Sequence, residues 1–146
     1  MNTSEVKREL QNCPLFRGVF PRNSLKKFKK PYAIVVNTDS DKEIGEHWVA
    51  VMVPKQGKLE YFDPMGWPPP HRDIINYLTS HRRKFQYCCY PLQGANSIQC
   101  GRYCIAFIKA RQRKISYQNF ISRFKNSSTF EQNDVKVTRY LNKLIR

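Results

Sequence analysis

The sequence contains no long hydrophobic run and no apolar leader at its start. None of its apolar stretches approaches the roughly 18 residues that a transmembrane helix needs. The first eight residues, Met1 to Arg8, lack the hydrophobic segment of a secretory signal peptide. We therefore expect a soluble, intracellular protein with no membrane partner.

Acidic residues are scarce, because 11 Asp and Glu face 26 Lys and Arg, for a formal net charge of +15. The basic residues are clustered at four places along the chain: Lys26 to Lys30, Arg82 to Lys84, Arg111 to Lys114, and the C-terminal Arg139, Lys143 and Arg146. Such clusters release condensed counterions when they meet phosphates. The excess favours a nucleic acid partner, and a merely solvated basic surface is the alternative.

The number and spacing of the cysteines argue against a secreted disulfide-rich protein and against a zinc-binding protein. There are five, an odd number, and without a signal peptide a secreted disulfide framework is improbable, so we expect reduced thiols. A zinc site would need about four convergent ligands. Cys100 and Cys104 are one helical turn apart, but the chain has no second such pair and no close pair of histidines. We expect no metal.

The 146 residues fit one domain, and the order of predicted elements indicates an α+β fold with a central, mostly antiparallel sheet flanked by helices. The segment Pro14 to Lys30 is predicted to be irregular. The predicted strands are 32–37, 47–53, 58–63 and 85–91, and the predicted helices are 4–13, 72–83, one that starts near Cys100, 117–121 and 137–145.

The stretch Gln93 to Cys104 predicts a reactive cysteine. Turn and cap formers precede Cys100, and an apolar helical pattern follows from Ile105, so Cys100 lies near the N-terminus of a helix. The positive end of the helix dipole favours the thiolate, which is the reactive form. A buried structural thiol is the alternative, and Cys104 is expected to be a core residue.

A cysteine nucleophile requires a base, a group that orients the base, and donors for the oxyanion. His47 begins a buried strand, and Asp63 ends the next strand of a predicted hairpin, which brings the two side chains to one rim. Gln93 lies seven residues before Cys100, and its side-chain amide together with the backbone N–H of Cys100 could form the oxyanion hole. The predicted catalytic set is therefore His47, Asp63, Gln93 and Cys100.

Three motifs resemble the adenovirus protease (adenain) family and, more distantly, the SUMO-protease-like cysteine peptidases. They are Glu46 to Trp48, Tyr61 to Trp67 and Gln93 to Cys104; the similarity covers roughly residues 4 to 110, and the helical tail after them is looser. The resemblance assigns His47, Asp63, Gln93 and Cys100 the same roles as the chemistry above. One departure is Asp63, because the adenovirus enzymes carry Glu there, and the shorter side chain must approach His47 more closely.

The resemblance also implies a function and partners. It implies a papain-like cysteine protease domain over residues 1–146 that cleaves viral precursor proteins at Gly-containing sites, in the host nucleus and the virion. It implies no metal or small-molecule cofactor, DNA as a polyanion that raises activity, and a viral activating peptide linked through a disulfide. For that disulfide Cys88 is the candidate, since strand alternation would turn Cys88 outward and Cys89 inward.

Two other functions remain open on the sequence. One is a non-catalytic nucleic-acid-binding or packaging protein, which the composition alone would favour but which has no need of His47, Asp63, Gln93 and Cys100 together. The other is a deconjugase of SUMO or ubiquitin with the same fold, since those modifiers also end in Gly-Gly.

Overall fold

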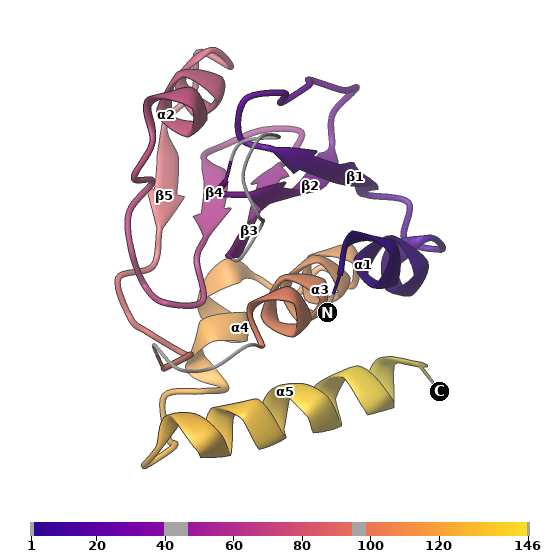
Figure 1. The fold of residues 1–146 in the computed structure, drawn as a ribbon, viewed down its shortest axis with the longest axis vertical. Coiled ribbons are helices and arrows are strands. Elements are labelled where there is room, and N and C mark those ends of the chain that lie inside the picture. The colour runs from indigo at the N-terminus through magenta and orange to yellow at the C-terminus, as the bar shows by residue number, and fades with distance from the viewer. Residues whose placement is uncertain (1, 40–46, 95–98, 146) are drawn as a thin grey trace.

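A computed structural model describes residues 2–39, 47–94 and 99–145 of the chain (Figure 1). In chain order its elements are α1 (Thr3–Leu10), β1 (Phe16–Pro21), β2 (Tyr32–Asn37), β3 (Trp48–Val53), β4 (Leu59–Phe62), α2 (Arg72–Thr79), β5 (Phe85–Tyr87), α3 (Cys100–Gln112), α4 (Tyr117–Ser122) and α5 (Phe130–Ile145). None of the helices in the described part of the chain is both long and apolar enough to cross a membrane.

The five strands form one sheet in the order β1-β2-β3-β4-β5. The central strands β2, β3 and β4 pair antiparallel, whereas β1 joins β2 and β5 joins β4 in parallel. The predicted sheet flanked by helices is confirmed, and its antiparallel character holds at the centre but not at the two edges. The hairpin of β3 and β4 is the part that carries the candidate site.

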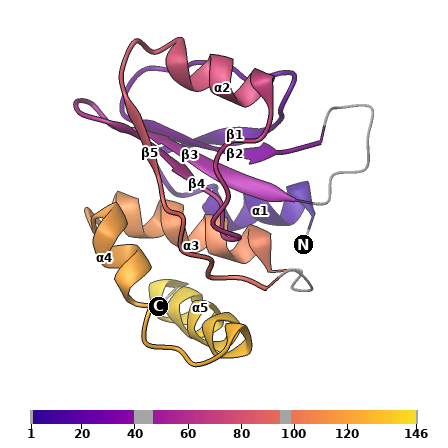
Figure 2. The same cartoon turned by 90° about the vertical axis from the view of Figure 1, so that its left-hand side faces the viewer.

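Both faces of the sheet are covered, which explains why β2 and β3 are apolar along nearly their whole length. Figure 2 shows α2 on one side of the sheet and α1, α3, α4 and α5 on the other. Successive residues alternate between two cores: Val49 and Val51 face the α2 side, and Ala50 and Met52 face the α3 side. The sheet is thus the middle layer between two hydrophobic clusters.

Three details of the predicted secondary structure were wrong. The irregular segment contains β1, an edge strand whose half-buried residues show no clear alternation. The last helix begins at Phe130 instead of near residue 137. Strand β5 ends at Tyr87, before Cys88. The central strands and the start of α3 at Cys100 are confirmed, since each is set by a strong local pattern.

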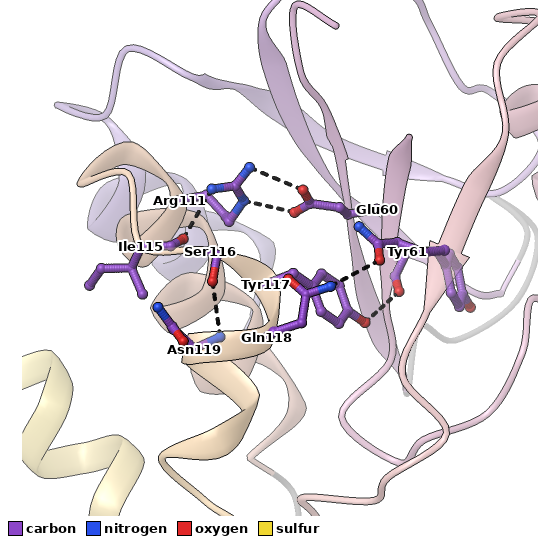
Figure 3. Close-up of polar contacts among 9 residues, drawn as sticks. Glu60, Tyr61, Arg111, Ile115, Ser116, Tyr117, Gln118 and Asn119 are labelled. Carbon is purple, nitrogen blue, oxygen red and sulfur yellow. Dashed lines mark hydrogen bonds and ion pairs between the residues drawn. The ribbon is translucent and has the colours of Figure 1, made fainter. Parts of the chain in front are cut away.

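Polar contacts tie strand β4 to the helical layer (Figure 3). The Arg111 guanidinium donates to both carboxylate oxygens of Glu60, at 2.7 and 3.0 Å, and also to the carbonyl of Ile115. The Tyr117 hydroxyl donates to the carbonyl of Tyr61 at 2.9 Å. These bonds fix the position of β4, and Asp63 is the residue that directly follows this strand. Arg111 is therefore a structural cation and not part of a free basic surface.

Candidate active site

The β3–β4 hairpin brings His47 and Asp63 together. His47 directly precedes β3 and Asp63 directly follows β4, at the same end of the hairpin. The register pairs Ala50 with Phe62, so its continuation places Asp63 opposite Val49. The side chains meet, with 2.8 Å between Nε2 of His47 and Oδ1 of Asp63. The shorter acid therefore reaches the histidine without distortion of the hairpin.

Asp63 is held as a buried carboxylate in a tight turn. Its side chain is 1% exposed, and its Oδ1 also accepts a hydrogen bond from the backbone N–H of Met65 at 2.8 Å. The Asp63 carbonyl accepts from the N–H of Gly66, which closes the turn. A buried carboxylate needs such donors and a cationic partner, and here the partner is His47.

Cys100 lies on the other side of His47, as the first residue of α3. It is buried, and its thiol is hydrogen-bonded to the His47 side chain. Because Nε2 of the ring contacts Asp63, the nitrogen that remains for the thiol is Nδ1. The three side chains thus form the chain acid, imidazole and thiol that nucleophilic catalysis requires.

The surroundings shift both proton equilibria toward an ion pair. Burial alone would lower the pKa of His47, but the hydrogen bonds and negative charges of Asp63 and Cys100 raise that pKa to about 9. Burial alone would raise the pKa of Cys100, but His47 and backbone hydrogen bonds from Trp48 and Gly101 lower it below its usual value. Both shifts favour the ion pair, a thiolate beside an imidazolium.

The segment that carries Gln93 is locked against the Asp63 turn. The backbone N–H groups of Leu92 and Gln93 both donate to the carbonyl of Pro64, at 2.8 and 3.0 Å. Gly66 has a φ of 76°, and a Cβ added there would lie 2.8 Å from the backbone nitrogen of Pro91. Gln93 itself is buried. The turn of the acid therefore sets the position of the predicted oxyanion-hole residue.

Helix α5 supports the same segment from the opposite side, which sequence reasoning missed. The buried Asn133 donates from Nδ2 to the carbonyl of Leu92 at 2.9 Å. The Tyr103 hydroxyl lies 2.7 Å from Oδ1 of Asp134 and 3.5 Å from that same carbonyl. The capping pattern at the start of α5 could have revealed the helix, but nothing local could have shown that Asn133 reaches Leu92.

Trp67, the last residue of the motif Tyr61 to Trp67, lies beside the site, although sequence reasoning assigned it no role. The residue is 56% exposed, and its ring centroid is 6.3 Å from that of His47. A large exposed aromatic at the rim offers apolar contact area to a bound ligand.

The other cysteines separate clearly from Cys100. Cys104 is fully buried in the core, as predicted, and its thiol donates to the carbonyl of Trp48. The predicted orientation of the adjacent pair was wrong, since Cys88 packs against the core and Cys89 is exposed. The reason is that β5 ends at Tyr87, so strand alternation does not extend to them, and the N–H of Cys88 bonds to the Tyr117 hydroxyl.

Parts of the predicted motifs lie outside the described residues, namely Glu46 and residues 95–98 of the loop before Cys100. Among the residues that are described, no three His, Cys, Asp or Glu side chains come together as a metal site.

The chain is 31% identical over 112 residues to the SUMO-1 cysteine protease S273R of African swine fever virus, a match over 66% of this chain and 41% of the relative. It is also 31% identical over 103 residues to the cysteine protease S273R of the Badajoz strain, over 62% and 37% of the two chains. The chain resembles viral cysteine proteases. It spans about two fifths of their length, and no family profile matches it.

Solved structures agree with the sequence matches. The crystal structure of the African swine fever virus pS273R protease covers 84% of this chain and 46% of its own, with a TM-score of 0.57 and 25% identity. The central domain of Lpg1148 from Legionella pneumophila, at 15% identity and a TM-score of 0.53, covers 88% of both chains and shares the fold alone. The fold is that of SUMO-protease-like cysteine proteases; the narrower likeness to the adenovirus enzymes stays a prediction.

Proposed function

We propose that this chain is a viral cysteine endopeptidase in which Cys100 is the nucleophile, His47 the general base and acid, and Asp63 the residue that orients His47. The observation that carries the proposal is the continuous contact from the Asp63 carboxylate through His47 to the Cys100 thiol. The similarity to viral cysteine proteases supports the reaction class.

The reaction begins with the Cys100 thiolate, whose proton has passed to Nδ1 of His47. The thiolate attacks the scissile carbonyl, and the oxyanion that forms accepts hydrogen bonds from the Cys100 backbone N–H and the Gln93 side-chain amide. The start of α3 adds the positive end of its dipole. As the intermediate collapses, the C–N bond breaks and His47 gives its proton to the leaving amine.

Water then completes the cycle. His47 takes a proton from a water molecule that attacks the thioester, the C–S bond breaks, and the second product leaves as a carboxylic acid. Asp63 stays ionised throughout and stabilises the imidazolium, since its buried carboxylate is 2.8 Å from the ring. No step requires a metal or a small-molecule cofactor.

For the substrate, we propose viral precursor proteins cut at Gly-containing sites. A deconjugase of SUMO or ubiquitin is the second candidate, because a relative carries the name SUMO-1 cysteine protease. Both candidates act at glycine-containing sites, and they differ in whether a short peptide suffices as the substrate. The packaging-protein alternative is disfavoured, since DNA binding alone has no use for the buried pair of His47 and Asp63.

Two activators belong to the proposal. DNA is the first, supported by the net charge of +15, although Arg111 is already neutralised by Glu60. A viral peptide joined by a disulfide is the second, and it would need an accessible thiol. Cys89 is exposed whereas Cys88 is half-buried, so Cys89 is the better attachment point. We also propose that the protease acts in the host nucleus and in the virion.

The decisive experiment is cleavage of a library of Gly-containing peptides by the natural chain and by Cys100→Ala, each with and without duplex DNA. The natural chain should cut, DNA should raise the rate, and Cys100→Ala should lose about a millionfold in kcat, as expected when a nucleophile is removed. Cys104→Ala serves as the matched control, because it removes a thiol one helical turn away.

Equal cleavage by Cys100→Ala would overturn the protease assignment. Inertness toward all peptides, combined with release of SUMO or ubiquitin from a conjugate, would favour the deconjugase. An unchanged DNA affinity in Cys100→Ala is expected in either case, because the Cys100 thiol is buried and the substitution removes no positive charge.

A further inference from the structure

A cationic pocket lies between α5 and the ends of α3 and α4, away from the candidate active site. Lys136, Arg139, Tyr140 and Lys143 follow the helical spacing i, i+3, i+4 and i+7, so they share one face of α5. Together with Arg113 and Arg123 they line a pocket of about 420 Å³. Figures 1 and 2 both show α5 lying along α3 and α4.

The charges of this pocket are not compensated. Five of its lining residues are cations and none is a carboxylate. Within the described part of the chain, none of the five makes an ion pair, although Arg22, Lys109 and Arg111 do. Like charges around one concavity repel each other, and a polyanion in the pocket would relieve that repulsion.

Local structure explains the positions of single cations but not their convergence. Arg113 and Arg123 directly follow the C-terminal ends of α3 and α4, and Lys143 lies in the last turn of α5, where the helix dipole favours a positive charge. Lys136 donates to the carbonyl of Arg123 at 3.3 Å. These contacts do not require that all five cations line one hollow without a carboxylate, and that convergence points to a ligand.

The pocket also offers a ring and a polar group. The Arg123 guanidinium stacks over the Tyr140 ring, 5.0 Å from its centroid, which orients the guanidinium. The Tyr140 hydroxyl is buried and has no hydrogen-bond partner among the described residues. An entering oxygen ligand is what such a hydroxyl needs.

We propose that this pocket binds a compact polyphosphate, several phosphates carried on one small molecule. Guanidinium groups match phosphate oxygens in pairs, and the two lysines add further positive charge. The cations converge from three segments onto one hollow of small-ligand size, whereas a nucleic acid backbone needs cations along a track. The proposal does not depend on the protease activity.

The test is calorimetric titration of the full chain with two probes, inositol hexakisphosphate and inorganic triphosphate, at physiological salt. Lys136→Gln/Lys143→Gln should weaken the binding of both at least tenfold. Lys26→Gln/Lys29→Gln is the matched control, since it removes the same two charges at exposed positions outside the pocket, and it should stay within twofold. Circular dichroism and the thermal midpoint check that each variant folds.

Three results would overturn the proposal. One is an equal loss in the control, which would mean that net charge alone attracts the probes. Another is no binding by the natural chain at physiological salt. The third is duplex DNA that binds through this pocket while neither small probe does, which would make nucleic acid the occupant. A rise in thermal midpoint with either probe that is lost in the pocket variant would support the site.

Discussion

The rim around His47 and the pocket on α5 handle charge in opposite ways. At the rim, the charges are buried and each has a partner of opposite sign within hydrogen-bonding distance. In the pocket, three cations from α5 and two from the ends of α3 and α4 gather at the surface with no carboxylate among them. The paired charges at the rim therefore shift the pKa values of His47 and Cys100, whereas the cations of the pocket, unpaired among the described residues, can attract an anion from solution. Local pairing of charges, not net charge, therefore separates a candidate reaction centre from a candidate binding site.

Apart from replacement of the nucleophile itself, the largest expected effect comes from removal of the charge that orients His47. Asp63→Asn should lower kcat/KM about a thousandfold. It should also lower the pKa of His47, because the carboxylate is one of the groups that raise that pKa to about 9. The high-pH limb of the activity profile, where the imidazolium loses its proton, should move to lower pH.

Kinetics from pH 5 to 10 measure this change. Asp73→Asn is the control, because it makes the same substitution at an exposed acid that pairs with Arg22, and it should leave the profile unchanged. A full-activity Asp63→Asn variant would remove Asp63 from the reaction.

A smaller effect is expected at the buried pair that anchors β4. Glu60→Gln leaves the Arg111 guanidinium without its counterion in a site where Glu60 is 6% exposed. Breaking such a pair costs about 3 kcal/mol of unfolding free energy. Chemical denaturation measures it, with Glu9→Gln as control, since Glu9 and Lys109 are 4.0 Å apart and more exposed. Equal losses in both variants would erase the distinction between buried and surface pairs.

The smallest effect on stability is expected at the pocket. Arg139→Gln removes one of several repelling charges at an exposed position outside the terminal turns of α5, so the free energy of unfolding should rise, by about 0.5 kcal/mol or less. Because salt screens exposed charges, the gain should disappear in 1 M salt. Denaturation at low and high salt measures it. A marked loss of stability would mean that Arg139 has a structural partner and that the pocket is not under repulsion.

Much of the fold could be predicted because its signals are local. The apolar runs of β2 and β3 and the turn between β3 and β4 define a hairpin, and a hairpin fixes which residues meet at its end. The contact of His47 with Asp63 follows from that register alone. The start of α3 at Cys100 likewise follows from the turn formers before it and the apolar pattern after it.

The parts that could not be predicted depend on partners distant in sequence. Strand β1 exists because β2 offers it an edge, and its own residues show no strand pattern. Arg111 was counted as free positive charge, although its carboxylate partner is 51 residues away. Asn133 reaches Leu92 across 41 residues. The residue pattern of a short stretch of sequence carries no information about partners that far away.

Gly66 gives the site a criterion by which related sequences can be sorted. Its backbone has a positive φ, and a Cβ would press on the backbone of Pro91, which cannot yield as a flexible side chain can. A homologue that keeps the histidine, the acid and the cysteine but carries a larger residue at this position must hold the turn after the acid farther from the segment before the glutamine. Glycine at position 66 therefore identifies sequences in which the turn after Asp63 packs against the Gln93 segment as it does in this chain.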